Sequence, residues 1–389
     1  MNAGKTVFAQ VMDYVHRETF QRIARRYHGE ESFPALSCRE HFLAMAFAQM
    51  ASLESLRDTV DCLEARADVL YHMGFRGPVR RSTLADANEQ RDWRLFAALG
   101  QYLIRRARRK YAGDPLGFDL DADVYAFDST TIDLCLSMFR WAKFRRTKAA
   151  IKLHVLLDLR GPIPSFVNIS DGKLHDVNAL DDLFIEAGAF YVMDRGYLDF
   201  TRLYALHSQR AFFVIRAKRG MSYTRQSSLP IEAESGVISD QIIYLRGRES
   251  REAYPERLRR VRYYDADTQR FFVYLTNNFE IPASTVAALY KSRWQVELFF
   301  KWIKQHLRIK RFFGTSAHAV KTQVWIAICV YSIVAILKKD LALDESLHKI
   351  LQIIGVNLFA KVPIQQLLTN TLSQKPDTVI SNQLHFNDL

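Results

Sequence analysis

Three acidic side chains of this chain stand where they could do chemistry together. Asp128 and Asp194 each follow a short apolar run, and Glu297 lies in a segment crowded with basic residues. Carboxylate oxygens are hard ligands that suit hard divalent cations, and such cations promote displacement at phosphorus. Three distant carboxylates in a basic chain therefore predict a divalent-metal site that faces a phosphate backbone.

The two aspartates are predicted to close strands of one sheet. The runs Val124–Phe127 and Phe190–Met193 are rich in β-branched and aromatic residues, and each acid follows its run directly. Mixed α/β sheets bind ligands at strand ends. Asp133 is an alternative to Asp128, but it follows the first strand rather than ending it.

A long helix is expected to carry the third acid, from Ala283 to about Arg308, with Pro282 at its start. Spaced at about 100° per residue, its apolar residues form a core-facing stripe. A separate narrow face holds Tyr290, Arg293, Glu297, Lys304 and Arg308. Charged helix faces are commonly only solvated. The accompanying strand-end aspartates favour a functional face here.

The net charge of the chain favours a polyanionic partner. The 389 residues include 54 Lys and Arg against 42 Asp and Glu, a formal net charge of +12. Nucleic acid is the commonest partner of such a chain, although a basic protein without one is the alternative. The four cysteines are scattered without a C-x-x-C pair, so neither a zinc cluster nor a disulfide framework is expected.

Periodicity divides the chain into four parts. The prediction is an α/β fold: a mixed-sheet core with a β-rich insertion, preceded by an all-helical domain and followed by helices. The insertion is expected to stand apart from the main sheet. The predicted parts are a helical region 1–112, a core 123–217 and 271–312, an insertion 218–270, and a C-terminal helical region 313–389.

Within the N-terminal region, Ser37 and Glu40 have the spacing of a capping box. The segment Ser82–Leu84 is expected to cap a short helix preceded by Arg80 and Arg81. That helix could be the recognition element of a helix-turn-helix, or part of an ordinary bundle.

A basic run follows the first strand. It carries no acid, and Trp141 and Phe144 are interleaved with its charges. It is predicted to be a DNA-contacting loop, with a solvated hairpin as the alternative. The basic residues are Arg140, Lys143, Arg145, Arg146, Lys148 and Lys152. His154 is predicted to be a core residue rather than a metal ligand.

No membrane span or signal peptide is expected. The N-terminus lacks an apolar core, and the longest apolar run, Val324–Leu337, has 14 residues. A span needs about 18 to 20, so the run is predicted to be a buried helix and the protein cytoplasmic.

The spacing Tyr290-x2-Arg293-x3-Glu297-x6-Lys304 resembles the signature of bacterial insertion-sequence transposases of family four. The contexts Phe-Asp-Ser-Thr around Asp128 and Asp-Arg-Gly-Tyr from Asp194 are similar to that family's first and second acids. The resemblance covers residues 123 to about 310, and the N-terminal helices also resemble a domain found in part of that family.

The resemblance implies a ribonuclease-H-like catalytic core and an N-terminal DNA-binding domain. It implies that Asp128, Asp194 and Glu297 bind two Mg²⁺ or Mn²⁺ ions, with no other cofactor. The implied phosphate contacts are Tyr290, Arg293 and Lys304, and Arg308 lies on the same face. The implied partners are double-stranded DNA, as transposon ends and target, in the bacterial nucleoid.

The implied activity is cleavage at inverted terminal repeats and joining of 3′ ends to target DNA by a homodimer. The C-terminal helices from Val324 onward are candidates for the dimer surface. Phe272 stands where some members have a tryptophan that stacks on a flipped base, and strand packing is the favoured role for it. The alternatives are a DNA endonuclease of the same fold and an inactive DNA-binding relic.

Overall fold

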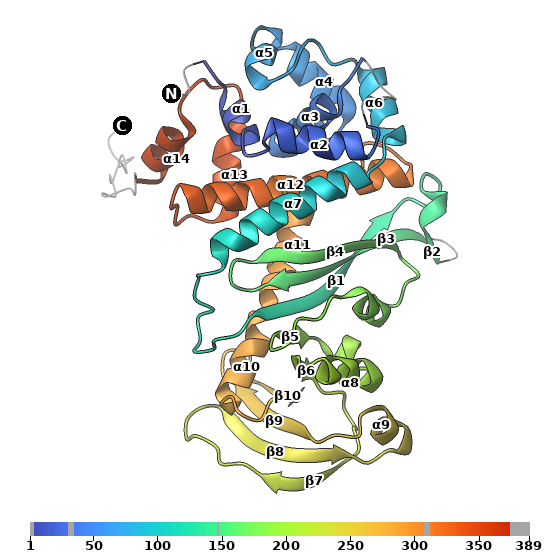
Figure 1. Ribbon diagram of the computed structural model, residues 1–389, viewed down its shortest axis with the longest axis vertical. Helices are drawn as coiled ribbons and strands as arrows, with labels where there is room; N and C mark the ends of the chain where they lie inside the picture. Colours follow the sequence, from blue (N-terminus) through green and yellow to red (C-terminus); the bar gives the residue numbers. More distant parts are fainter. Residues whose placement is uncertain (1–3, 30–34, 146–147, 307–311, 374–389) are drawn as a thin grey trace, which may run out of the picture.

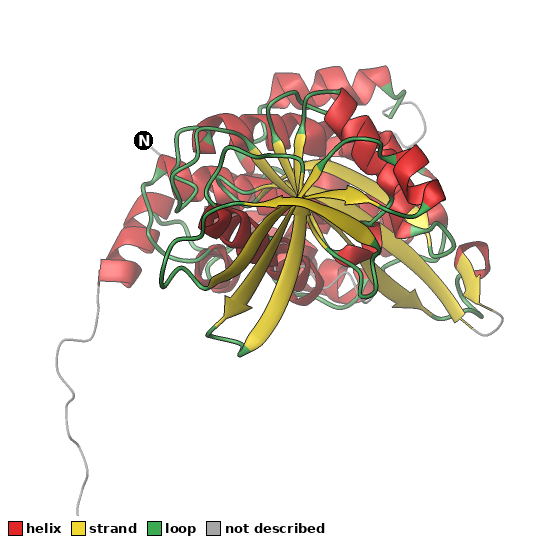
Figure 2. Cartoon of the chain, turned by 90° about the horizontal axis from the view of Figure 1, so that it is seen from below, coloured by secondary structure: helices red, strands yellow, loops and turns green. Residues whose placement is uncertain are grey.

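The computed structural model describes residues 4–29, 35–145, 148–306 and 312–373. Its centre is a ten-stranded sheet in the order β2-β3-β1-β5-β6-β10-β9-β8-β7, with β4 also paired to β3 (Figure 1). Figure 2 shows the strands fanning about a common centre, as the twist of sheets requires. The strands are β1 Val124–Leu134, β2 Lys143–Arg145, β3 Lys148–Asp158, β4 Ile163–Asp171, β5 Phe190–Met193, β6 Phe212–Arg216, β7 Tyr223–Ser228, β8 Val237–Leu245, β9 Leu258–Asp265 and β10 Arg270–Thr276.

The middle of the sheet is parallel and buried on both faces. Strand β5 pairs in parallel with β1 on one side and with β6 on the other. Alternate residues of β1 enter different cores: Val124 and Ala126 pack toward the long helices, Tyr125 and Phe127 toward α8. Two-sided burial explains why these strands read as unbroken apolar runs. The predicted mixed-sheet fold is confirmed.

The β-rich insertion continues the main sheet, which corrects the expectation that it stands apart. Strand β10 pairs with β6 on one edge and with β9 on the other, and β8 and β7 follow. The bidentate pair of Arg259 and Asp240, both nearly inaccessible to solvent, ties β9 to β8. The sequence does not indicate this continuity. One face of these strands is open to water, so charged residues interrupt the apolar ones, unlike in the central strands.

The helices are α1 Val7–Met12, α2 Arg17–Arg26, α3 Cys38–Met50, α4 Leu56–Glu64, α5 Leu70–Met73, α6 Arg81–Gln90, α7 Arg94–Tyr111, α8 Phe200–Ser208, α9 Arg248–Ala253, α10 Ala283–Ser292, α11 Trp294–His306, α12 Ala317–Asp340, α13 Leu347–Val356 and α14 Ile364–Ser373. Short 3₁₀ turns are η1 Ala67–Val69, η2 Arg140–Ala142, η3 Asp176–Asp182 and η4 Arg195–Tyr197.

Two helix predictions are wrong. The residue pattern predicts a helix over residues 178–187, but they form no α-helix, because η3 ends at Asp182 and hydrogen bonds from Tyr125 and to Tyr191 tie Glu186 to the sheet. The cap expected at Ser82–Leu84 is also absent: Arg80 has the extended backbone of an N-cap, so α6 begins at Arg81.

The two ends of the chain fold into one helical layer over the sheet (Figure 1). The amides of Val7 and Phe8 donate to carbonyls of Ala360 and Leu358, and Gln49 donates to the Gln323 carbonyl. Helix α12 is long and apolar enough to span a membrane by composition, yet 94% of its most apolar window is buried inside the protein. The apolar run Val324–Leu337 is thus a core helix, as predicted, and it is not available as a dimer surface.

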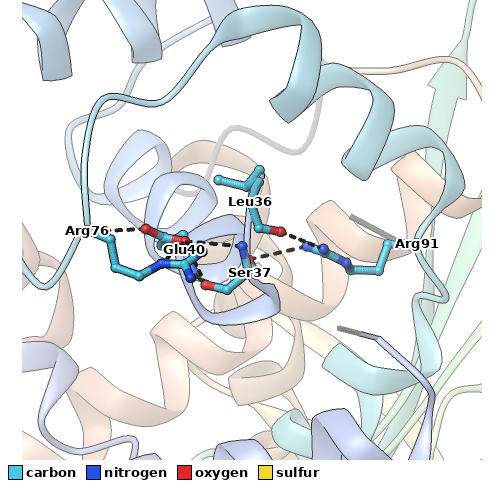
Figure 3. A network of polar contacts seen from close by, with 5 residues as sticks. All are labelled: Leu36, Ser37, Glu40, Arg76 and Arg91. Atoms are coloured by element: carbon cyan, nitrogen blue, oxygen red, sulfur yellow. Dashed lines mark hydrogen bonds and ion pairs between the residues drawn. The ribbon is translucent and has the colours of Figure 1, made fainter. Parts of the chain in front are cut away.

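The start of α3 is fixed by a polar network (Figure 3). Ser37 and Glu40 form the predicted capping box. Glu40 also accepts three hydrogen bonds from Arg76, at 2.7, 2.9 and 3.1 Å, and buried Arg91 donates to the carbonyls of Leu36 and Ser37. Burial raises the pKa of Glu40, but the bonds from Arg76 and Ser37 outweigh it and bring that pKa to about 2.

We expect Glu40→Gln to lower the free energy of unfolding at pH 7 by roughly 1 to 3 kcal/mol. A depressed carboxyl pKa stabilises the fold above the unfolded pKa and ceases to do so as pH falls from about 4.5 toward 2. Urea midpoints of wild type and variant should therefore converge between pH 7 and pH 3. Glu18→Gln, on exposed α2, is the control; a difference that does not change with pH would contradict this account.

Candidate active site

Asp128 and Asp194 occupy equivalent places on neighbouring parallel strands. Phe127 of β1 is in register with Met193 of β5, so the two acids are the next residue on each strand. Asp194 follows β5, as predicted. Asp128 does not end its strand, because β1 runs on to Leu134 paired only with β3. Asp128 instead follows the part of β1 that is buried on both faces. The apolar run Val124–Phe127 marks that part of the strand, not the whole strand.

Glu297 reaches these acids through Arg293. The guanidinium of Arg293 donates to Asp128 Oδ2 at 2.8 Å and to Glu297 Oε1 at 2.7 Å. The Tyr290 hydroxyl donates to Asp194 Oδ1 at 2.7 Å. The structure therefore brings all three acids together with two of the residues of the predicted helix face.

The predicted long helix is divided at Arg293. The amide of Arg293 bonds the Tyr290 carbonyl, and the amide of Val296 bonds the Arg293 carbonyl, so the turn is tighter than an α-helical turn. Helices α10 and α11 flank it. The side chain of Arg293 leaves the helix there and enters the space between the carboxylates.

The charges of these groups are coupled. Burial, together with the neighbouring carboxylates of Glu297 and Asp194, raises the pKa of Asp128 to about 6, although the Ser129 amide and Arg293 act in the opposite direction. Burial and the bond to Asp194 also raise the pKa of the Tyr290 hydroxyl, so Tyr290 acts as a donor at neutral pH. Positive charge is thus strongly favoured between the acids.

These oxygens suit a hard cation in their chemistry, because one cationic group already joins two of the three carboxylates. Among the described residues, no three His, Cys, Asp or Glu side chains lie close enough to share one ion. Arg293 stands between Asp128 and Glu297, and an ion shared by them would take its place. Asp133 is exposed farther along β1, so it is a poor substitute for Asp128.

The remaining predicted DNA contacts divide into two groups. Lys304 of α11 donates to the Thr131 carbonyl at 2.9 Å and to the Thr130 hydroxyl, so its ammonium lies against β1, close to Asp128 along the strand. The basic run forms η2, β2 and the start of β3: Arg140, Lys143, Arg145 and Lys148 are exposed. Lys152 instead bonds the Leu174 carbonyl and Asp176. Arg146 and Arg308 lie outside the described residues.

His154 is a core residue, as predicted. It is fully buried in β3, its Nε2 lies 2.9 Å from the Ser170 hydroxyl, and burial lowers its pKa.

A cavity of about 670 Å³ opens beside the acids, between β10 and α10. Its lining includes Asp194, Tyr290, Arg293 and Phe272. Phe272 is only partly buried, so strand packing does not account for all of its ring. Its ring lies 6.1 Å from that of Tyr274, nearly parallel to it.

Arg216 is a site residue that the sequence reading missed. Its guanidinium lies 4.9 Å from the centre of the Phe272 ring and lines the same cavity. Ile215 is in register with Met193, so Arg216 occupies on β6 the place that Asp194 occupies after β5 and Asp128 on β1. The sequence indicates this position, because the apolar run 211–215 is directly followed by a charged residue, as the runs before the two aspartates are.

Known proteins resemble this chain over the region that contains the three acids. Residues 119–333 match the family described as Transposase DDE domain, and residues 3–76 match a domain of unknown function, DUF4372. The chain is 35% identical over 262 residues to a Sinorhizobium fredii protein named as transposase y4zB, which covers 65% of this chain and 70% of that protein. A Geobacillus stearothermophilus protein, named as a transposase for insertion sequence element IS5377, is 32% identical over 52% of this chain and 54% of its own length. A Synechocystis protein, named as a transposase for element IS4SA, is 23% identical over 66% of this chain and 71% of its own.

Proposed function

Because this chain belongs to the family of insertion-sequence transposases with a DDE domain, we propose that it binds inverted terminal repeats, cuts the DNA there and joins the 3′ ends to target DNA. The family supports action on DNA, and proteins with this domain generally use divalent metal ions. The terminal-repeat substrate, the joining step and the residues that perform them are the proposal.

One observation carries the assignment of the site. Asp128 and Asp194, at equivalent places on adjacent parallel strands, meet Glu297 of α11 through Arg293 and Tyr290. A purely structural ion pair would not require a third acid or a hydroxyl donor aimed at it. A carboxyl with a raised pKa, such as that of Asp128, is typical of catalytic sites when it lies among other acids beside a cavity.

The proposed chemistry is in-line displacement at a DNA phosphorus. Two Mg²⁺ or Mn²⁺ ions held by Asp128, Asp194 and Glu297 would activate a water or a 3′-hydroxyl and stabilise the leaving oxygen. Arg293 turns from the carboxylates to a phosphate oxygen, since guanidinium binds either anion bidentately. Tyr290 and Lys304 position the strand on either side of the acids, and Lys304 of α11 does so from its contact with β1.

The basic run and the helix face extend the proposed DNA path. Arg140, Lys143, Arg145 and Lys148 project from the hairpin of β2 and β3, next to the strand that carries Asp128. With Arg146 and Arg308, they would neutralise backbone phosphates without reading bases. Two copies must hold two ends together, so a homodimer is proposed for the DNA complex.

A cleavage and strand-transfer assay tests the proposal. The full chain is incubated with Mg²⁺, a target plasmid and a labelled duplex that carries the terminal repeat of its element. We expect a nick or break at the repeat end and labelled DNA joined to the plasmid, both abolished by a chelator. A mutated repeat is the control duplex. No cleavage of the correct repeat would refute the proposal.

A DNA endonuclease of the same fold is the second candidate function. The same three acids would serve hydrolysis equally well, because water and a 3′-hydroxyl attack phosphorus in the same geometry. The assay separates the two: hydrolysed ends without labelled plasmid would establish the endonuclease. An inactive relic would bind the repeat and give neither product.

A further inference from the structure

A cavity of about 380 Å³ in the N-terminal helices is lined by arginines. It lies at the start of α3, and helix α2 and the loop after Gly74 form its other walls. Its four guanidinium groups belong to Arg17, Arg25, Arg39 and Arg76, and Glu40 is the one carboxylate among the described residues that line it. The cavity is therefore strongly electropositive.

Helix α2 presents two of these arginines on a single face. Arg17 and Arg25 are eight residues apart, about two helical turns, with Gln21 between them on the same lining face. Arg22 and Arg26, which directly follow Gln21 and Arg25, are exposed but do not line the cavity. The same short helix thus carries two arginine pairs of equal charge, only one of which faces the cavity.

The opposite wall is fixed before any ligand arrives. Glu40 holds Arg76 by three hydrogen bonds, and Arg91 holds the carbonyls of Leu36 and Ser37 (Figure 3). The N-terminal end of α3, which carries partial positive charge, is thereby kept at the cavity. An anion would lose little entropy in ordering this wall.

Arg39 indicates that the positive charge is incompletely balanced. It is partly buried, and its Nε is a buried donor for which the described residues provide no acceptor. One of its terminal nitrogens bonds the Val15 carbonyl. Burial lowers the pKa of Arg39, and the charge of Arg17 lowers it further. Buried donors are nearly always satisfied, so an anion that accepts from this guanidinium fits the arrangement.

We propose that this arginine cavity binds a phosphate group of the DNA backbone. The proposal rests on the proposed function, which makes DNA the substrate, and it assigns a DNA-binding surface to the domain of unknown function. Guanidinium groups bind phosphate oxygens bidentately, and backbone contacts of this kind position a protein on a duplex. The exposed arginines of α2 let a duplex reach the cavity from solvent.

The site is separate from the candidate active site. The N-terminal helices lie beyond α7 and α12 from the sheet that carries the acids (Figure 1). Binding there would anchor a part of the duplex away from the cut bond. It is also separate from Arg80 and Arg81 at the start of α6, the surface that a helix-turn-helix would use.

The test compares the two arginine pairs of α2 in the full chain. Fluorescence anisotropy measures binding of a terminal-repeat duplex by wild type, Arg17→Ala/Arg25→Ala and Arg22→Ala/Arg26→Ala over a salt series. We expect the first variant to lose about 10- to 100-fold in affinity near 0.1 M salt, and its log Kd–log salt slope to fall by about one to two. The control variant should stay within about threefold of wild type. It loses the same charge, but from exposed positions outside the cavity, where solvent and salt screen the interaction with DNA.

Equal losses in both variants, or no loss in either, would overturn the proposal. Thermal midpoints equal to wild type would show that both variants are folded, and Arg17→Lys/Arg25→Lys should recover part of the affinity. Inorganic phosphate distinguishes a DNA phosphate from a free phosphate as the ligand. If it displaces DNA no more than another salt does at equal ionic strength, a site for the DNA backbone is supported. Tight phosphate binding, with DNA affinity unchanged in the first variant, would instead establish a small-anion site.

The outcomes do not merge with those of the proposed function. At saturating duplex, the control variant Arg22→Ala/Arg26→Ala should cut DNA at nearly the wild-type rate, because it changes neither the acids nor the lining of the cavity. Absence of cleavage by wild type would defeat the proposed function and leave the binding comparison interpretable. Cleavage by wild type, with both α2 variants binding alike, would defeat this inference alone.

Discussion

Asp128→Asn is expected to lower DNA cleavage by at least about 10³-fold and to leave affinity for the terminal duplex within about threefold. Asparagine keeps the size of the side chain and its place on β1, but it removes the negative charge that a cation and Arg293 both require. The rate of cleavage at saturating duplex and the dissociation constant measured separately distinguish chemistry from binding.

Asp133→Asn is the matched control for this variant. It removes the same charge from the same strand, five residues farther on, where the side chain is exposed. We expect near-wild-type cleavage from it. If Asp133→Asn were inactive and Asp128→Asn active, the first acid of the site would have been assigned to the wrong residue, although the fold would stand.

The positions of the first two acids could be predicted because burial leaves a local trace. A strand covered on both faces must be apolar at every position, so Val124–Phe127 and Phe190–Met193 mark where the doubly covered part of the sheet ends. The acids follow at once. The same reasoning applies to Arg216, which follows the apolar run 211–215 as the two acids follow theirs, although its charge is opposite.

The break at Arg293 could not be predicted, since it depends on a partner distant in the sequence. An unbroken helical pattern extends through residues 283–306, whereas the tightened turn coincides with the bond of Arg293 to Asp128, a residue far away in the sequence. The false helix at 178–187 has a similar cause. There the carboxylate of Glu186 accepts from the Tyr125 hydroxyl and its amide donates to the Tyr191 hydroxyl, contacts that no local propensity encodes.

The packing of the N- and C-terminal helices into one layer could not be predicted from separate segments of the sequence. Each end of the chain reads correctly as helical, and the capping box at Ser37 is local enough to be recognised. That the ends share one core rests on contacts such as Phe47 with Phe359, whose rings lie 5.4 Å apart. Apolar stripes show that a helix has a partner but not which one.

Arg293→Gln is the second variant with a large expected effect, because Arg293 has two roles in this account. Cleavage should fall by about 10²- to 10³-fold, since glutamine supplies no positive charge to a phosphate in the transition state. Arg293→Lys should fall between wild type and Arg293→Gln. An ammonium keeps the charge but cannot join Asp128 and Glu297 as the planar guanidinium does.

The second role predicts a response that activity alone would not reveal. Without Arg293, the carboxylates of Asp128 and Glu297 face each other with no shared cation, so in chelator the variant should unfold at lower temperature than wild type. Added Mn²⁺ should then raise its midpoint by more than it raises that of wild type, because in wild type the ion must first displace the guanidinium.

Lys291→Gln is the control, since Lys291 lies two residues away and pairs with exposed Asp267 instead of with the acids. Its midpoint should respond to Mn²⁺ as wild type does. Equal Mn²⁺ shifts in Arg293→Gln and wild type would mean that the ion and the guanidinium do not compete for the same carboxylates. Since one guanidinium now joins two of the three acids, competition is the outcome that the geometry requires if those acids are to hold a metal at all.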